Sequence, residues 1–288
     1  MSGRLSARAW LGWSLAAVAV ALSTDNPVYR GLVAAAALNV LIAWLPRSRS
    51  LRPLGFGLAF AVFFAVLVNG LAGHGGADAI VSVPDAVPIF GGPITIESLL
   101  FGCSVGLGLV AALLAVAPLS MVVESHEIID AIPARLERTG IAVATSLNLI
   151  SGIGATFRAV REAQAMRGWR PRGIGSWREV VVPVVLTAIE DSALLAEAME
   201  ARAFGAARRT SYAIATWSGR DGLVVATAAG SFAAFVALRV AGYDPDWYPY
   251  PTPYLPSIQP LLVVACLALA LPAFLAPSPA GRPAEAVA

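Results

Sequence analysis

The chain contains no lysine, and histidine, cysteine and charged residues in general are scarce. All 20 basic residues are arginine, charged residues make up 13% of the 288 residues, and there are two histidines and two cysteines. A nucleotide-binding P-loop requires a lysine, so the chain cannot be an ATPase of that class. Cys103 and Cys266 fall in apolar runs, where a thiol packs as a small hydrophobic group, and they predict neither a disulfide framework nor a metal site. The net charge of +2 averages over segments of opposite sign and predicts no nucleic-acid-binding surface.

Long apolar runs dominate what is present. Hydrophobic residues account for 58% of the sequence, which is more than a soluble domain usually carries. A membrane-spanning helix needs about 20 mostly apolar residues, and six runs approach that length: 10–22, 28–45, 54–71, 99–119, 223–241 and 258–275. The sequence therefore predicts an all-α integral membrane protein with about six transmembrane helices in the lipid bilayer. The first run is short, and a cleaved signal peptide is the alternative for it.

The distribution of arginine predicts the orientation of these spans. Arg4 and Arg8 precede the first run, and the region 121–220 is rich in arginine, whereas the loops 74–98 and 242–257 contain none. Because cytoplasmic loops retain positive charge, six alternating spans place both termini and the region 121–220 in the cytoplasm. The predicted organisation is a transmembrane bundle of four spans at 1–120, a cytoplasmic coupling-helix segment at 121–220, two further spans at 221–276 and a disordered tail at 277–288.

Two amphipathic helices are predicted in the cytoplasmic segment, interrupted by Gly140 and by the Gly- and Pro-rich run 168–175. In each helix, side chains spaced three and four residues apart form one stripe that can pack on another helix. The stripes are Val143, Ser146, Ile150, Ile153, Phe157, Val160 and Gln164 in the first helix, and Val185, Ala188, Ser192, Leu195 and Met199 in the second. The part 141–153 is apolar enough to enter the membrane. An interfacial position is the better prediction, because another crossing would invert the charge pattern.

Each stripe leads to an arginine in a repeated segment of the form Glu-Ala-x-x-x-Arg-small-aromatic. The two copies are 162–169 and 197–204, and their arginines are Arg167 and Arg202. An arginine near a helix C-terminus is favoured by the helix dipole, and a following glycine commonly ends a helix, so capping explains one copy alone. For two copies with the same offset and the same type of flanking residue, helix capping and a docking site for a partner are equally favoured.

The repeated segments resemble the coupling helices of the transmembrane T component of energy-coupling factor (ECF) transporters, the family that includes the cobalt-transporter Q proteins. The resemblance lies in the stretch 161–168 of the first copy and, most specifically, in the stretch 183–205 around the second. By this resemblance the ATPase-docking residues would be Ala165, Met166, Arg167, Gly168, Ala201, Arg202 and Ala203. Met166 stands where the family has alanine, and Ala203 where it has glycine. Alanine is costly in the left-handed conformation that ends many helices, so the second copy is expected to differ in docking geometry.

The resemblance implies a non-catalytic coupling subunit of a vitamin or metal-ion uptake transporter in a bacterial or archaeal cell (inner) membrane. Its partners would be two ATP-binding cassette ATPase subunits and a membrane-embedded substrate-binding S component. Arg167 and Arg202 would dock into grooves on the ATPases and pair with acidic residues there. The coupling helices would pack through Ile150, Ile153, Phe157, Val160, Val185, Ala188, Leu195 and Met199. The resemblance implies no catalytic residue, metal or cofactor in this chain.

The residues leave two other functions open. The permease of an ordinary ABC importer has a cytoplasmic loop whose start fits 162–168, but the second arginine copy has no role in it. A polytopic membrane enzyme acting on lipid or isoprenoid substrates would draw on Glu190, Asp191 and His126. Adjacent helix positions point in different directions, so the two carboxylates are not expected to converge. The run 106–111 mimics a dinucleotide-binding fingerprint, yet small residues in a span usually serve helix packing.

Overall fold

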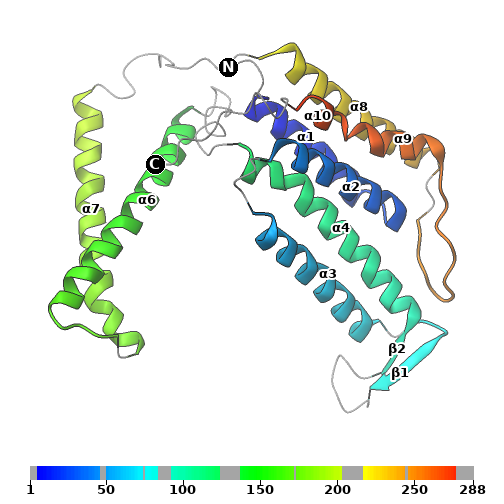
Figure 1. Ribbon diagram of the computed structural model, residues 1–288, viewed down its shortest axis with the longest axis horizontal. Helices are drawn as coiled ribbons and strands as arrows, with labels where there is room; N and C mark the ends of the chain where they lie inside the picture. The colour runs from blue at the N-terminus through cyan, green and yellow to red at the C-terminus, as the bar shows by residue number, and fades with distance from the viewer. Residues whose placement is uncertain are drawn as a thin grey trace. The chain divides into compact units, whose positions relative to one another are not determined.

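The computed structural model consists of two compact units, whose elements are drawn in Figure 1. The first unit comprises 1–128 and 216–288, and the second comprises 129–215, which lies within the predicted coupling-helix segment 121–220. The structure describes residues 5–45, 50–73, 75–83, 92–123, 137–171, 173–202, 217–243 and 246–276. The predicted disordered tail at 277–288 lies outside the described residues.

The first unit is built from apolar helices. Those described are α1 (Ala7–Leu22), α2 (Pro27–Trp44), α3 (Arg52–Ala72), α4 (Ile96–Met121), α8 (Gly219–Val240), α9 (Pro260–Ala268) and α10 (Leu271–Phe274). Within the described residues, α2, α3, α4 and α8 are long and apolar enough to cross a membrane, whereas α1 is apolar but shorter. The chain is therefore mainly helical, and these four helices fit an all-α membrane protein.

Helix α4 is the centre of this unit. Helices α1, α2 and α3 all pack against it, α1 also packs against α8, and α9 lies against α2 and α8. Figure 1 shows α2, α4 and α3 side by side. Trp10 and Trp13 of α1 are fully buried, and the ring of Trp10 packs edge-on against Trp13 and against Trp44 of α2. Helix α1 is thus an integral part of the packed bundle.

Helices α1 and α8 begin at the same end of the bundle, which we call the Ser6 end. Ser6 caps α1, and its backbone N–H donates to Oδ1 of Asp221 at 2.7 Å. The other carboxylate oxygen of Asp221 accepts from the backbone N–H and the hydroxyl of Ser218 at 2.8 and 2.7 Å. Ser218 in turn caps α8. One buried carboxylate therefore joins two helix N-termini that are far apart in the sequence.

Helices α2 and α9 begin at the opposite end, the Asn26 end. Asn26 caps α2 by accepting the N–H of Val28 at 3.0 Å, and its side-chain amide donates to the carbonyl of Ser257 at 2.9 Å. The hydroxyl of Tyr29 accepts the N–H of Gln259, the residue that precedes α9, at 2.8 Å. Helix α1 has 16 residues and is therefore roughly 24 Å long at 1.5 Å per residue. Helix α2 begins at Pro27, shortly after α1 ends. The Ser6 end and the Asn26 end therefore lie on opposite sides of the bundle.

The last apolar run, 258–275, was predicted as one continuous helix, and that prediction was wrong. The structure has two helices there, α9 and α10, because Pro272 has no N–H to continue the helical hydrogen bonds. Tryptophans of other helices donate to one carbonyl at the break and to one inside α10. Nε1 of Trp13 donates to the carbonyl of Leu269 at 2.9 Å, and Nε1 of Trp44 donates to the carbonyl of Pro272 at 2.8 Å.

Glycines of α4 allow α3 to approach closely. A Cβ atom added at Gly102 would lie 2.9 Å from Cα of Val66, and one added at Gly106 would lie 3.2 Å from Cα of Val62. Any larger residue at Gly102 would therefore separate the helices. The interpretation of the run 106–111 as a helix-packing segment is confirmed at Gly106.

A short antiparallel sheet of β1 (Ala79–Val83) and β2 (Gly92–Thr95) precedes α4 and departs from the all-α expectation. Three of the five residues of β1, Ile80, Val81 and Val83, are β-branched, which favours an extended backbone. Thr95 ends β2 and caps α4, because its hydroxyl accepts the N–H of Ser98 while Ser98 Oγ accepts the N–H of Thr95. The sheet therefore leads directly into the first turn of α4.

The second unit is a helical hairpin of α6 (Glu137–Met166) and α7 (Arg178–Ala201), joined through the short 3₁₀ helix η2 (Ile174–Trp177) (Figure 1). The predicted interruption at Gly140 was wrong, because α6 runs through it; a single glycine costs a helix only about 1 kcal/mol relative to alanine. The predicted break at 168–175 is confirmed. Helix α6 is not among the four helices that fit a membrane span in the described part of the chain.

We expect Asp221→Ala to destabilise the first unit by about 2 kcal/mol or more, because three donors at two helix N-termini lose a charged acceptor. Thermal unfolding of the detergent-solubilised chain measures this change. The matched control is Asp246→Ala, which removes an acid whose side chain is 72% exposed and paired with Arg239. An exposed pair contributes at most about 1 kcal/mol, so equal losses in the two variants would contradict the anchoring role of Asp221.

Candidate functional site

Helix α6 ends in a tightly hydrogen-bonded turn directly at the first arginine of the repeat. The N–H of Trp169 donates to the carbonyl of Gln164 at 2.9 Å, and the N–H of Gly168 donates to the carbonyl of Ala165 at 3.0 Å. This pair of bonds is the Schellman motif, which needs a left-handed residue after the helix. Gly168 supplies it with φ of +86°. Arg167 therefore occupies the position immediately before that glycine, at the C-terminus of α6.

The second arginine has an equivalent place on α7. Arg202 follows the last helical residue, Ala201, and its N–H bonds to the carbonyls of Ala198 at 3.3 Å and Met199 at 3.2 Å. Ala203, predicted as part of the docking segment, lies outside the described residues. Both arginines thus stand at helix C-termini, where the carbonyl ends favour positive charge.

The side chains around both arginines are exposed. Arg167, Arg202 and the flanking residues Ala165, Gly168 and Ala201 are exposed, and Met166 is 80% exposed. Within the described residues, neither arginine forms an ion pair. Exposed guanidinium groups next to small side chains can make directional hydrogen bonds to the carboxylates of another protein.

Three aromatic rings hold the end of α6 against the beginning of α7. The ring of Trp177 stacks on Phe157 with a centroid distance of 6.1 Å and an interplanar angle of 9°, and Trp169 meets it edge-on at 5.5 Å. Nε1 of Trp169 also donates to the carbonyl of Ser176 at 3.1 Å. We call Phe157, Trp169 and Trp177 the aromatic corner.

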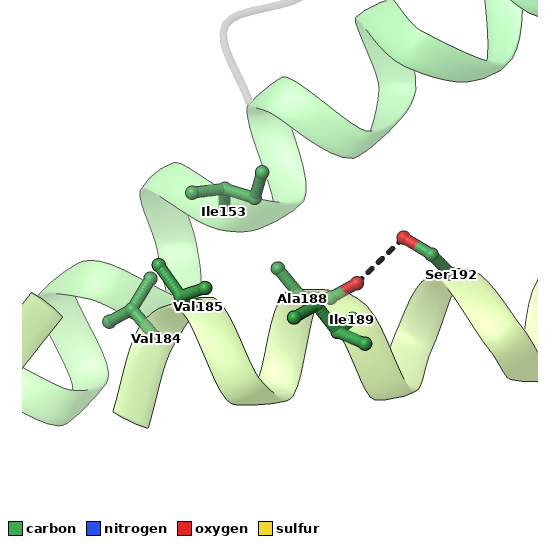
Figure 2. A pocket seen from close by; sticks show the side chains of 6 residues that line it. All are labelled: Ile153, Val184, Val185, Ala188, Ile189 and Ser192. Carbon is green, nitrogen blue, oxygen red and sulfur yellow. Dashed lines mark hydrogen bonds between the residues drawn. The ribbon is translucent and has the colours of Figure 1, made fainter. Parts of the chain in front are cut away.

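An apolar cleft of about 410 Å³ lies between α6 and α7 further along the hairpin. It is lined by Ile153 of α6 and by Val184, Val185, Ala188, Ile189 and Ser192 of α7, as Figure 2 shows. The only hydroxyl in this lining, that of Ser192, donates to the carbonyl of Ala188 at 2.6 Å. The cleft is therefore suited to apolar contact rather than to binding a charged ligand.

The predicted packing stripes are only partly covered in the hairpin. Phe157, Val160, Ala188, Leu195 and Met199 are half-buried, whereas Ile150, Ile153 and Val185 are exposed. The two buried side chains of α7 are Val180 and Val184, which the stripe did not include. Much of the apolar surface of both helices is thus left uncovered within this unit.

The residues considered for an enzyme do not converge in the described structure. Glu190 and Asp191 are exposed on α7, and His126 lies outside the described residues. No group of three metal-binding side chains occurs among the residues that the structure describes.

The first unit contains an ion pair between the buried Arg30 and the half-exposed Asp25 that was not predicted from the sequence. Arg30 donates through Nη2 to Oδ1 of Asp25 at 2.8 Å and through Nη1 to Oγ of Ser104 at 3.0 Å. Ser104 donates to the carbonyl of Asp25 at 2.7 Å, and Gly108 leaves room for the guanidinium. A charged residue inside an apolar run was the available signal. This network ties the beginning of α2 to α4.

The loop after α8 also packs against α4. The ring of Phe101 packs against the rings of Tyr248 and Tyr250, with centroid distances of 5.7 and 6.2 Å. Within the loop, Nε1 of Trp247 donates to the carbonyl of Tyr254 at 2.9 Å. Burial, with a smaller effect of the neighbouring Tyr248 and then of Glu97, raises the pKa of the Tyr250 hydroxyl above its ordinary value. Tyr250 therefore stays neutral at physiological pH.

A scan against protein-family models and a search of curated proteins found no match to this chain.

We expect Gly168→Ala to strain the end of α6 by about 1 kcal/mol, because L-residues with a side chain disfavour the left-handed conformation. Amide hydrogen exchange at Trp169 should then accelerate roughly fivefold. The matched control is Gly154→Ala within α6, where an added Cβ meets nothing within 4 Å. Alanine favours a helix interior, so the control should slow exchange, and similar acceleration in both variants would contradict a special role for Gly168.

Proposed function

We propose that this chain is the transmembrane coupling subunit of an ATP-driven uptake transporter of the ECF type. The observation that carries the proposal is the pair of exposed arginines at two helix C-termini, each in one copy of the same sequence segment. The resemblance of these segments to ECF coupling helices supports a pair of ATPase subunits as the partner. The subunit itself is non-catalytic, and ATP is hydrolysed by separate subunits, in keeping with the absence of lysine.

Arg167 and Arg202 each dock on one of two cytoplasmic ATPase subunits. The helix dipole alone explains a cation at a helix end. It does not explain why both cations are exposed and followed by small residues, which let a partner backbone approach the guanidinium. Acidic residues in grooves of the ATPases are the complementary groups. When the ATPases close on ATP, they draw the two helix ends together.

The apolar faces of α6 and α7 transmit this movement to a membrane-embedded substrate-binding S component. The uncovered apolar side chains on the hairpin, such as Ile150 and Leu186, support a further partner, because a solvated helix pair does not usually leave so many exposed. The transported solute binds to the S component, and this chain provides the mechanical connection.

Six membrane spans with both termini in the cytoplasm complete the proposal. Helices α1 and α8 begin at the Ser6 end and α2 and α9 at the Asn26 end, which agrees with alternating spans. The sixth span is the broken pair α9 and α10. Its break is compatible with a membrane because Trp13 donates to the carbonyl of Leu269 there. The arginine distribution puts the Ser6 end on the cytoplasmic side.

We expect Arg167→Ala and Arg202→Ala each to weaken association with the ATPase subunits by about 2 kcal/mol or more, roughly 30-fold, because a partner carboxylate loses its counter-charge. Co-purification from membranes and titration of the solubilised chain with the ATPases measure this loss.

Arg161→Ala is the matched control, since it removes an exposed arginine of α6 that is not part of either repeat. Full ATPase association and uptake by the double variant Arg167→Ala/Arg202→Ala would refute the docking role. Turnover of a lipid substrate by the purified chain alone would point to a membrane enzyme instead.

A further inference from the structure

The helix end that carries Arg167 is braced by neighbouring elements. The Schellman turn closes the end of α6, and Nε1 of Trp169 donates to the carbonyl of Ser176 in η2 at 3.1 Å. The side chain of Gln164, three residues before Arg167, donates to the carbonyl of Glu179 in the first turn of α7 at 3.4 Å. The first docking arginine is thus exposed but stands at a braced corner of the hairpin.

Trp177 is the side chain on which this brace depends. It contacts Phe157, which precedes Arg167 in α6, and Trp169, which follows Arg167 in the turn. The chain is therefore held on both sides of the arginine by the same indole ring. Phe157 lies about 15 Å from Arg167 along the helix at 1.5 Å per residue, whereas Trp169 is two residues after it. The brace therefore holds the backbone before and after Arg167 and does not contact the guanidinium itself.

We infer that Trp177 is a positioning residue that fixes the direction in which Arg167 is presented to its ATPase subunit. A flexible helix end must be ordered when a partner binds, and that ordering lowers affinity, whereas a pre-formed end avoids the loss. Trp177 touches neither the ATPase nor Arg167 in this role. The inference rests on the proposed function, because it concerns how one of the two docking arginines is held.

The test is a double-mutant cycle with the ATPase subunits that co-purify with the wild-type chain. Trp177→Leu removes the aromatic ring, and it is measured in two backgrounds. In Arg202→Ala, binding relies on Arg167, and Trp177→Leu is expected to weaken it roughly tenfold. In Arg167→Ala the brace has no arginine to position, and the same substitution should change binding less than about twofold.

Two further variants separate positioning from general damage. Trp177→Phe keeps a ring that can stack on Phe157 and should bind within about twofold of wild type. Trp217→Leu removes an exposed tryptophan of the first unit and should leave ATPase binding unchanged. Amide exchange at Gly168 and Trp169 in the chain without ATPases should accelerate in Trp177→Leu while the helix content of the chain is retained. Unchanged exchange at these two amides would overturn the inference.

The failures of the inference and of the proposed function are distinguishable. If neither arginine variant weakens ATPase binding, the proposed function is wrong and the positioning role falls with it. If both arginines matter but Trp177→Leu costs the same in the two backgrounds, the proposed function stands and only the positioning role is overturned.

Discussion

The carboxylate of Asp221 and the amide of Asn26 each stand where two helices begin, one at each end of the first unit. Helices as apolar as α3 and α4 gain little from leaving a lipid environment for one another, so close packing and buried polar contacts decide their arrangement. Each polar contact here satisfies helix-terminal groups that have no partner within their own helix. The register of α1, α2, α8 and α9 depends on these few contacts.

The positions of the long helices could be predicted because length and hydropathy are local properties of the sequence. Helix α2 was expected at 28–45 and spans Pro27–Trp44, and α3 was expected at 54–71 and spans Arg52–Ala72. The break between α9 and α10 has a local signal in Pro272, but hydropathy does not register it. What could not be predicted is the contact from Trp13 of another helix to the carbonyl of Leu269, because a contact between distant segments leaves no periodic trace.

The candidate site could likewise be predicted only in part. The repeat located Arg167 and Arg202, and the structure has both at helix C-termini, where the spacing of the stripes had led. The aromatic corner was not predicted, because its three rings come from a helix, a turn and a 3₁₀ helix that share no common period. The buried residues of α7, Val180 and Val184, also lie outside the stripe that was predicted for this helix. The contacts of side chains at a turn depend on how the chain folds back on itself and not on helical periodicity.

The contact between α3 and α4 has a geometric consequence. Val62 and Val66 are four residues apart on α3, and the glycines that they meet, Gly102 and Gly106, are four residues apart on α4. Leu99 of α4 fits against Gly70, one further helical turn along α3. Close approach therefore depends on glycines from both helices, and three successive turns of the contact each place one glycine against a larger side chain of the other helix. The separation of α3 and α4 is thus fixed at several points along their length, and a side chain at any one of these glycines would open the whole contact.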